Sequence, residues 1–359
     1  MKAPIRLAVI GVGDVAYRDY LPHIGRIANL ARVEMVIARD RGRVERAARD
    51  FSVPIARTNW RDAMGPEVDA VLNLTPAPVH GEINLALAQS GRHVYSEKPF
   101  ARDVDEGRVI RAAAAKSGAV FAAAPSVVVY PQVKRAAQIL ASGELGAIHS
   151  VRANATGSPP PWGGYIGDHA PFFSAEVGPL SDMGVYPLHA LTGLLGNVVA
   201  VSAMGQRTRD GFAVTDGPFA GTTVPVLVQD NWQILLSLAS GPLATLQVGF
   251  CTAQPAACHV EISGERGSMT VPLLDPTSPL LVFAGGILRT EPVAHERLDG
   301  PDHILGVRDF LKAIHDKRDP VINTQHALHV VAIRQAIAQA AQSGARVPVQ
   351  PISSPESDE

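Results

Sequence analysis

Residues 7–16 read Leu-Ala-Val-Ile-Gly-Val-Gly-Asp-Val-Ala, and this stretch decides the fold class that we predict. Four consecutive apolar residues are typical of a strand that is buried on both faces. The glycines that follow permit a tight turn and a close approach of the backbone to a bound group. Gly11, Gly13 and Ala16 have the spacing of the dinucleotide fingerprint. The stretch indicates a nucleotide-binding turn, although an ordinary strand-to-helix turn that uses glycine has the same pattern.

The composition describes an ordinary globular protein of about two domains. Of the 359 residues 46% are hydrophobic, and the net charge of −2 predicts neither a nucleic-acid partner nor an anionic membrane surface. The N-terminus lacks a signal-peptide pattern and no apolar run reaches about 18 residues, so we expect a cytoplasmic protein. Cys251 and Cys258 are too few for a disulfide framework, and we interpret both as structural thiols.

The end of the second predicted strand bears on the choice of cofactor. The apolar run at residues 33–38 is followed by Arg39, Asp40 and Arg41. An acidic side chain at this position accepts hydrogen bonds from ribose hydroxyls, whereas an arginine pairs with a 2′-phosphate. Asp40 therefore favours NAD, while its arginine neighbours leave NADP open, and a solvated loop is the alternative reading of all three.

Strands and helices alternate along the first half of the chain. Predicted strands at residues 68–74 and 93–95 enclose a helix at residues 79–89. This alternation predicts an α/β domain of the Rossmann type, a doubly wound parallel sheet whose ligands bind at the carboxyl ends of the strands. Thr75-Pro76 and residues 96–99 follow such strand ends.

One part of this half resembles a known family. Residues 71–80 read Val-Leu-Asn-Leu-Thr-Pro-Ala-Pro-Val-His, and residues 91–99 read Gly-Arg-His-Val-Tyr-Ser-Glu-Lys-Pro. This order is similar to the glucose-fructose oxidoreductase and inositol dehydrogenase family (Gfo/Idh/MocA). The resemblance implies that Lys98 faces both the nicotinamide and the substrate; without it, a lysine paired with Glu97 at a strand end would be the simpler interpretation. The cofactor contacts that we expect are Gly11, Gly13, Asp14, Val15, Asp40, Arg41, Thr75, Pro76, His80, Glu97 and Lys98.

A second constellation lies at residues 178–189. On a helix, residues four apart share a face, so Asp182 and Tyr186 are expected to project together, with His189 about one turn further on. The resemblance implies that Asp182 and Tyr186 orient and protonate the substrate oxygen; His189 stands where the family often has aspartate. The alternative is an N-capping aspartate with two core-lining rings. Asp182 and His189 lack further ligands, so we expect no metal.

A loop rich in proline and glycine covers residues 158–165. Trp162 and Tyr165 in this loop are candidates to stack on a sugar ring, and the loop is a candidate lid over the substrate. A surface loop without substrate contact fits the same composition.

From residue 199 the pattern changes to strands, which predicts an α+β domain with a large, mostly antiparallel open sheet. We place a dinucleotide-binding domain at residues 1–124, a substrate-binding and oligomerisation domain at residues 125–348, and a disordered tail at residues 349–359. Along one predicted strand the residues of one face are Trp232, Ile234 and Leu236, and those of the other are Gln233, Leu235 and Ser237. We expect the first face to pack on helices and the second to meet a second subunit. The resemblance implies a homodimer or homotetramer formed through this sheet.

Together these observations predict an NAD(P)-dependent oxidoreductase. Its reaction would move a hydride between nicotinamide and a secondary alcohol or ketone of a sugar, cyclitol or related polyol. Lys98, Asp182 and Tyr186 are the expected catalytic residues, and Lys98, Trp162, Tyr165, Asp182, Tyr186 and His189 are the expected substrate contacts. The alternatives are a dinucleotide-binding sensor without chemistry and an NAD-using glycosidase of the same family.

Overall fold

The computed structural model describes residues 3–158, 167–174, 177–215, 217–253, 256–293 and 302–352. Within these ranges the chain forms two compact units. Unit 1 contains residues 3–126, 303–331 and 352, and unit 2 contains the described residues of 127–302 together with 332–351. Residues 303–331 thus belong to unit 1, which corrects their assignment to the second domain.

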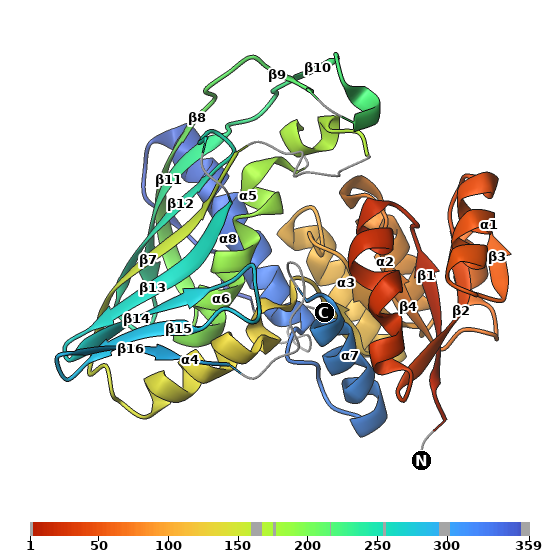
Figure 1. The fold of residues 1–359 in the computed structure, drawn as a ribbon, viewed down its shortest axis with the longest axis horizontal. Coiled ribbons are helices and arrows are strands. Elements are labelled where there is room, and N and C mark those ends of the chain that lie inside the picture. The colour runs from red at the N-terminus through yellow and green to blue at the C-terminus, as the bar shows by residue number, and fades with distance from the viewer. Residues whose placement is uncertain are drawn as a thin grey trace. The chain divides into compact units, whose positions relative to one another are not determined.

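Unit 1 is built on a six-stranded parallel sheet in the order β3-β2-β1-β4-β5-β6 (Figure 1). Leu7, Ala8 and Val9 in the central strand are fully buried, as a strand covered on both faces requires. The strand order changes direction between β1 and β4, and such a point opens a ligand crevice at the carboxyl ends of the strands. The strands are β1 (Ile5–Ile10), β2 (Ala31–Ile37), β3 (Ile55–Arg57), β4 (Ala70–Asn73), β5 (His93–Ser96) and β6 (Phe121–Ala123).

The helices of unit 1 pack along this sheet, with α1 on β2 and β3, α2 on β4 and β5, and α7 on β5 and β6. The packing of α7 explains why a late segment joins unit 1, and the Ala123 amide also donates to the Ile322 carbonyl at 3.0 Å. The helices are α1 (Arg41–Asp50), η3 (Trp60–Met64), η4 (Ala77–Val79), α2 (His80–Gln89), α3 (Val104–Ser117) and α7 (Ile304–Asp316). Helix α8 (Thr324–Ser343) begins in unit 1 and ends in unit 2.

The helix after the glycine turn is irregular. It consists of a π-helical turn, η1 (Ala16–Tyr20), and a 3-10 segment, η2 (Leu21–Ile27). Pro22 has no amide hydrogen to donate, and its ring clashes with the preceding turn of an α-helix. The irregular geometry follows from that proline.

Unit 2 contains a nine-stranded sheet in the order β16-β15-β14-β13-β7-β12-β11-β8-β17. Only the β12–β7 pair among these described strands is parallel, which confirms the predicted mostly antiparallel sheet. The strands are β7 (Ile148–Thr156), β8 (Val198–Gln206), β11 (Asn231–Leu238), β12 (Leu243–Gly249), β13 (Ala257–Gly264), β14 (Gly267–Pro272), β15 (Leu280–Ala284), β16 (Ile287–Glu291) and β17 (Val347–Pro348), with β9 (Gly211–Ala213) and β10 (Thr223–Pro225) in a separate pair.

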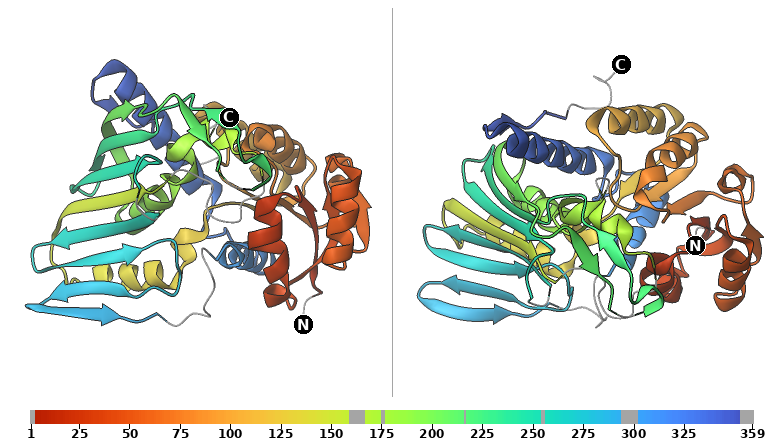
Figure 2. Two further views of the ribbon diagram at one scale, coloured as in Figure 1. Left: turned by 45° about the horizontal axis from the view of Figure 1, so that its top comes forward. Right: turned by 90° about the horizontal axis from the view of Figure 1, so that it is seen from above.

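One face of the large sheet is covered by helices of unit 2, which are α4 (Pro131–Ala141), α5 (Gly178–Asp182) and α6 (Val185–Leu195) (Figure 2). Along β11, Ile234 and Leu236 are buried and Leu235 is 59% exposed, as the alternation predicts. At the end of the chain, Val349 donates its amide to the Val199 carbonyl at 2.9 Å, so the predicted disordered tail cannot begin at residue 349. Residues 353–359 of that tail lie outside the described residues.

Within the described ranges, no helix has the length and apolar character that a membrane crossing requires.

Candidate functional site

The glycine turn follows β1 at the carboxyl edge of the parallel sheet. Gly11 has a φ of +93°, and a β-carbon there would lie 2.5 Å from the Leu74 carbonyl oxygen. Both the positive φ and this close approach require glycine. A β-carbon on Gly13 would meet no atom within 4 Å, so the turn leaves open space at its second glycine. This is the position at which the fingerprint admits a pyrophosphate.

Asp14 and Val15 connect the turn to η1. Asp14 pairs with Arg18 at 2.6 Å, and Arg18 also pairs with Asp19 at 2.8 Å. Arg18 is half-exposed, so this group of charges lies at the surface beside the turn. The carboxylates of both aspartates share one guanidinium group.

Asp40 lies at the end of β2, where we expected it. It is the N-cap of α1, and its Oδ1 atom accepts a hydrogen bond from the Arg43 amide at 2.7 Å. This cap holds the exposed carboxylate in one orientation at the strand end. The neighbouring Arg41 points its guanidinium to Glu45, 2.8 Å away.

Thr75 and Pro76 follow β4, and His80 begins α2. The His80 ring is 2% exposed, with Nδ1 2.9 Å from the Pro99 carbonyl oxygen and Nε2 2.6 Å from the Thr75 carbonyl oxygen. Each ring nitrogen thus lies within hydrogen-bonding distance of a carbonyl oxygen, one in the loop after β4 and the other in the loop after β5. The cofactor contact that we expect of His80 stays a prediction; in the structure its ring lies between two strand-end loops.

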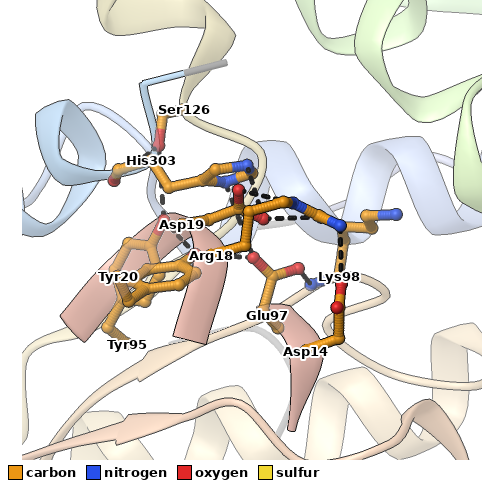
Figure 3. Close-up of polar contacts among 9 residues, drawn as sticks. All are labelled: Asp14, Arg18, Asp19, Tyr20, Tyr95, Glu97, Lys98, Ser126 and His303. Carbon is orange, nitrogen blue, oxygen red and sulfur yellow. Dashed lines mark hydrogen bonds and ion pairs between the residues drawn. The ribbon is translucent and has the colours of Figure 1, made fainter. Parts of the chain in front are cut away.

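Glu97, Lys98 and Pro99 follow β5 on the same sheet edge, and the Lys98–Pro99 peptide bond is cis. Glu97 is buried, and its Oε2 atom accepts a hydrogen bond from the Lys98 amide at 2.9 Å. Burial raises the pKa of the Glu97 carboxyl group, but electrostatic interactions with His303 and Lys98 and hydrogen bonds from Tyr20 and the Lys98 amide together hold that pKa below its ordinary value. Glu97 is consequently an anion at neutral pH. Figure 3 shows the groups around it.

In unit 2, Asp182 is the last residue of α5, whereas Tyr186 and His189 belong to α6. The single helix that we expected is interrupted at Met183 and Gly184. The Gly184 amide donates to the Pro179 carbonyl, five residues back, instead of continuing the regular pattern. All three candidate side chains are buried, at 5% or 6% exposure. Tyr186 and His189 are three residues apart on one helix and therefore share a face.

Trp162 and Tyr165, with most of the proline-rich loop, lie outside the described residues. The described residues contain no group of three or more His, Cys, Asp or Glu side chains arranged to hold a metal ion. Cys258 is buried, and burial raises the pKa of its thiol well above the ordinary value. Such a thiol is a poor nucleophile.

Several polar residues that support the strand-end loops were missed from the sequence. Asn84 of α2 connects the ends of β4 and β5 and the loop after β5: its side-chain amide accepts from Asn73 at 2.8 Å and donates to Ser96 Oγ at 2.9 Å and to the Phe100 carbonyl at 3.1 Å. The sequence did contain a signal for Asn84, because a polar residue on the apolar face of a predicted helix indicates a buried hydrogen-bonding role. Tyr20 and His303 were also missed, and no sequence motif marks them.

The fold and these loops define unit 1 as a dinucleotide-binding domain. Residues 5–124 match the family model described as "Oxidoreductase family, NAD-binding Rossmann fold", and residues 133–270 match the "GFO/IDH/MocA C-terminal domain". The chain belongs to the Gfo/Idh/MocA family of oxidoreductases and is an NAD(P)-dependent dehydrogenase or reductase.

Two relatives and one solved structure are similar to this chain. A dTDP-3,4-didehydro-2,6-dideoxy-alpha-D-glucose 3-reductase of Actinomadura kijaniata is 32% identical over 224 residues, which are 61% of this chain and 65% of that protein. The uncharacterized oxidoreductase ORF334 of Rhizobium meliloti is 26% identical over 95% of this chain and 98% of its own length. A levoglucosan dehydrogenase in complex with NADH has a TM-score of 0.85 at 22% identity, covering 98% of this chain and 100% of that one. At this identity the structural match shows the fold alone.

Proposed function

We propose that this protein transfers a hydride between the nicotinamide of NAD and a secondary alcohol or ketone of a sugar, cyclitol or related polyol. The observation that carries the proposal is the position of Lys98, which follows β5 on the sheet edge that also bears the glycine turn after β1. Ligands of doubly wound sheets bind along this edge. Two of the similar proteins named above have the names of a sugar reductase and a sugar dehydrogenase, which supports a sugar-like substrate.

The residues of unit 1 fit a dinucleotide. The open space at Gly13 suits the pyrophosphate, and the capped carboxylate of Asp40 suits the hydroxyls of the adenosine ribose. The same carboxylate repels a 2′-phosphate, and the nearby Arg41 is engaged with Glu45, so we propose NAD in preference to NADP. When bound, the nicotinamide supplies the hydride acceptor or donor.

We assign the proton chemistry to three side chains. In the oxidative direction the phenolate form of Tyr186, assisted by the ammonium group of Lys98, accepts the hydroxyl proton as the carbon gives its hydride to the nicotinamide, and Asp182 holds that hydroxyl in place. In the reductive direction the same groups return the proton. His189, Trp162 and Tyr165 are the further substrate contacts in this proposal.

The test compares Lys98→Ala and Tyr186→Phe with wild type. We expect each variant to lower turnover at least about a hundredfold with nearly unchanged NADH affinity, because each loses one acid–base group. Lys116→Ala, at an exposed position of α3, is the matched control and keeps wild-type turnover. Binding is followed by NADH fluorescence, and turnover by the absorbance of the reduced nicotinamide with a panel of polyols and keto-sugars. Near-normal turnover in either variant would remove that residue from the mechanism.

The open face of the large sheet is the surface through which we propose that the protein forms a homodimer or homotetramer. Met204, Leu235 and Leu243, on β8, β11 and β12, are 78%, 59% and 65% exposed. These three strands are neighbours in the sheet. Exposed apolar side chains on adjacent strands favour a protein partner.

A further inference from the structure

A cluster of buried polar side chains in unit 1 includes Glu97, the residue before Lys98 (Figure 3). We call it the Glu97 cluster, and its members are Tyr20, Tyr95, Glu97, Ser126 and His303. The Tyr20 hydroxyl donates to Glu97 Oε1 at 2.5 Å, and His303 Nδ1 lies 3.7 Å from the same oxygen. The Tyr95 hydroxyl lies 3.5 Å from that of Tyr20 and 3.3 Å from Ser126 Oγ. All five residues are 7% exposed or less.

The fold brings these residues together from four segments. Tyr20 ends η1, Tyr95 belongs to β5, and His303 is the N-cap residue of α7. Ser126 Oγ donates to the His303 carbonyl oxygen at 3.2 Å, which fixes the start of α7. Gly306 lets this helix approach, because a β-carbon there would lie 2.8 Å from the Tyr95 hydroxyl.

Both oxygens of the Glu97 carboxylate are used inside the protein. Oε1 accepts from Tyr20 and faces His303, while Oε2 accepts from the Lys98 amide. A buried carboxylate is costly unless hydrogen bonds and an opposite charge compensate it. These contacts supply that compensation, and one of them belongs to the backbone of the proposed catalytic lysine.

His303 faces a second carboxylate on its other side. Its Nε2 atom lies 3.8 Å from Asp19 Oδ2, and Asp19 also pairs with Arg18. The titratable and charged groups around Glu97 are Asp19 and Tyr20 of η1, Tyr95 of β5, the adjacent Lys98, and His303 before α7.

We propose that His303 and Tyr20 are positioning residues, which hold the Glu97 carboxylate against the Lys98 amide so that the Lys98 peptide stays in one orientation. This inference rests on the proposed hydride transfer, in which Lys98 acts on the substrate. His303 and Tyr20 act through Glu97 and not on the reacting atoms.

The proposal predicts how the cluster responds to acid. Protonation of Glu97 weakens its hydrogen bond to the Lys98 amide, because bonds to a charged acceptor are the stronger ones. The contacts with His303 and Tyr20 lower the pKa of Glu97, so removing either contact raises that pKa. Activity that needs the Glu97 anion is lost as the pH falls through this pKa. In either variant the loss therefore begins at a higher pH.

The Lys98 amide proton reports on this bond without turnover. The chain has six lysines, so protein labelled with 15N-lysine gives a simple spectrum in which Lys98→Arg identifies the Lys98 signal. We expect the Lys98 amide proton to move upfield in Glu97→Gln at neutral pH. We expect its acid titration to shift upward by at least about half a pH unit, a threefold change in proton concentration, in Tyr20→Phe and His303→Gln.

Tyr17→Phe is the matched control, because it removes a phenol of η1 that bonds to Asp50 at the surface. It should leave the Lys98 amide signal and its titration unchanged. An unchanged signal in Glu97→Gln, or an unshifted titration in both Tyr20→Phe and His303→Gln, overturns the proposal. Tyr20→Phe keeps the aromatic ring, so a failure of His303→Gln to fold does not remove the test.

Steady-state kinetics of the same variants distinguish a failure of this inference from a failure of the proposed function. We expect Tyr20→Phe and His303→Gln to lower kcat about tenfold, the scale of one hydrogen bond to a charged group, with KM for NADH unchanged. The acid limb of their pH–rate profiles should move with the amide titration. If that limb stays in place while the amide titration moves, the positioning role is refuted. If wild type transfers no hydride, the proposed function fails, and the amide signals still decide whether the cluster holds the Lys98 peptide.

Discussion

Asp40 has two roles in this account, and substitution with serine or alanine separates them. As the N-cap of α1 it accepts the Arg43 amide at 2.7 Å, and as an exposed carboxylate at the end of β2 it selects against a 2′-phosphate. Serine caps a helix about as well as aspartate, whereas alanine loses about 1 kcal/mol. Asp40→Ser therefore removes the charge and keeps the cap, while Asp40→Ala removes both.

The size of the charge effect follows from Coulomb's law. A carboxylate and a doubly charged phosphate about 5 Å apart in water repel each other by about 1.7 kcal/mol, and salt lowers this value. We therefore expect both variants to reduce the ratio of NADH to NADPH affinity about tenfold. Fluorescence titration with each nucleotide measures this ratio, and urea unfolding measures stability. An affinity ratio within about twofold of wild type in Asp40→Ser, or equal losses of stability in the two variants, would refute the reasoning.

Two further predictions concern packing and assembly. Gly306→Ala places a methyl group 2.8 Å from the Tyr95 hydroxyl and should lower the free energy of unfolding by about 1–3 kcal/mol. In Gly25→Ala the added methyl group meets no atom within 4 Å, so this control should leave that free energy nearly unchanged. Urea unfolding measures both variants. Equal effects at the two glycines would contradict the close approach of α7. Leu235→Lys on the open sheet face should convert the oligomer to a smaller species, which light scattering measures as a lower mass. Val109→Lys, on α3 and 53% exposed, is the control and should leave the mass unchanged. An unchanged mass for Leu235→Lys would exclude this face as the subunit interface.

The local parts of the fold could be predicted from sequence. The strand at residues 5–10, its glycine turn and the alternation of buried and exposed side chains along β11 are local. Each is determined by residues close together in the chain, so the sequence pattern contains the information. Glu97 to Pro99 was predicted because a family resemblance marked it, since spacing alone favours a simple lysine–glutamate pair.

Where the sequence predictions failed, the physical reason is one that the spacing of residue types along the chain does not contain. The break at Met183 and Gly184 interrupts a helical pattern that looks continuous in the sequence. His303 could not be predicted because its partner Glu97 is far away in the chain. Only the packing of α7 on β5 brings the two residues together.

The central claim is hydride transfer that depends on Lys98. Its most direct test is the rate at which reduced nicotinamide forms when NAD and a panel of sugars and polyols are mixed with wild type or with Lys98→Ala. We expect reduced nicotinamide to form with at least one member of the panel for wild type, at a rate at least about a hundredfold higher than for the variant. Equal rates in the two proteins would contradict it.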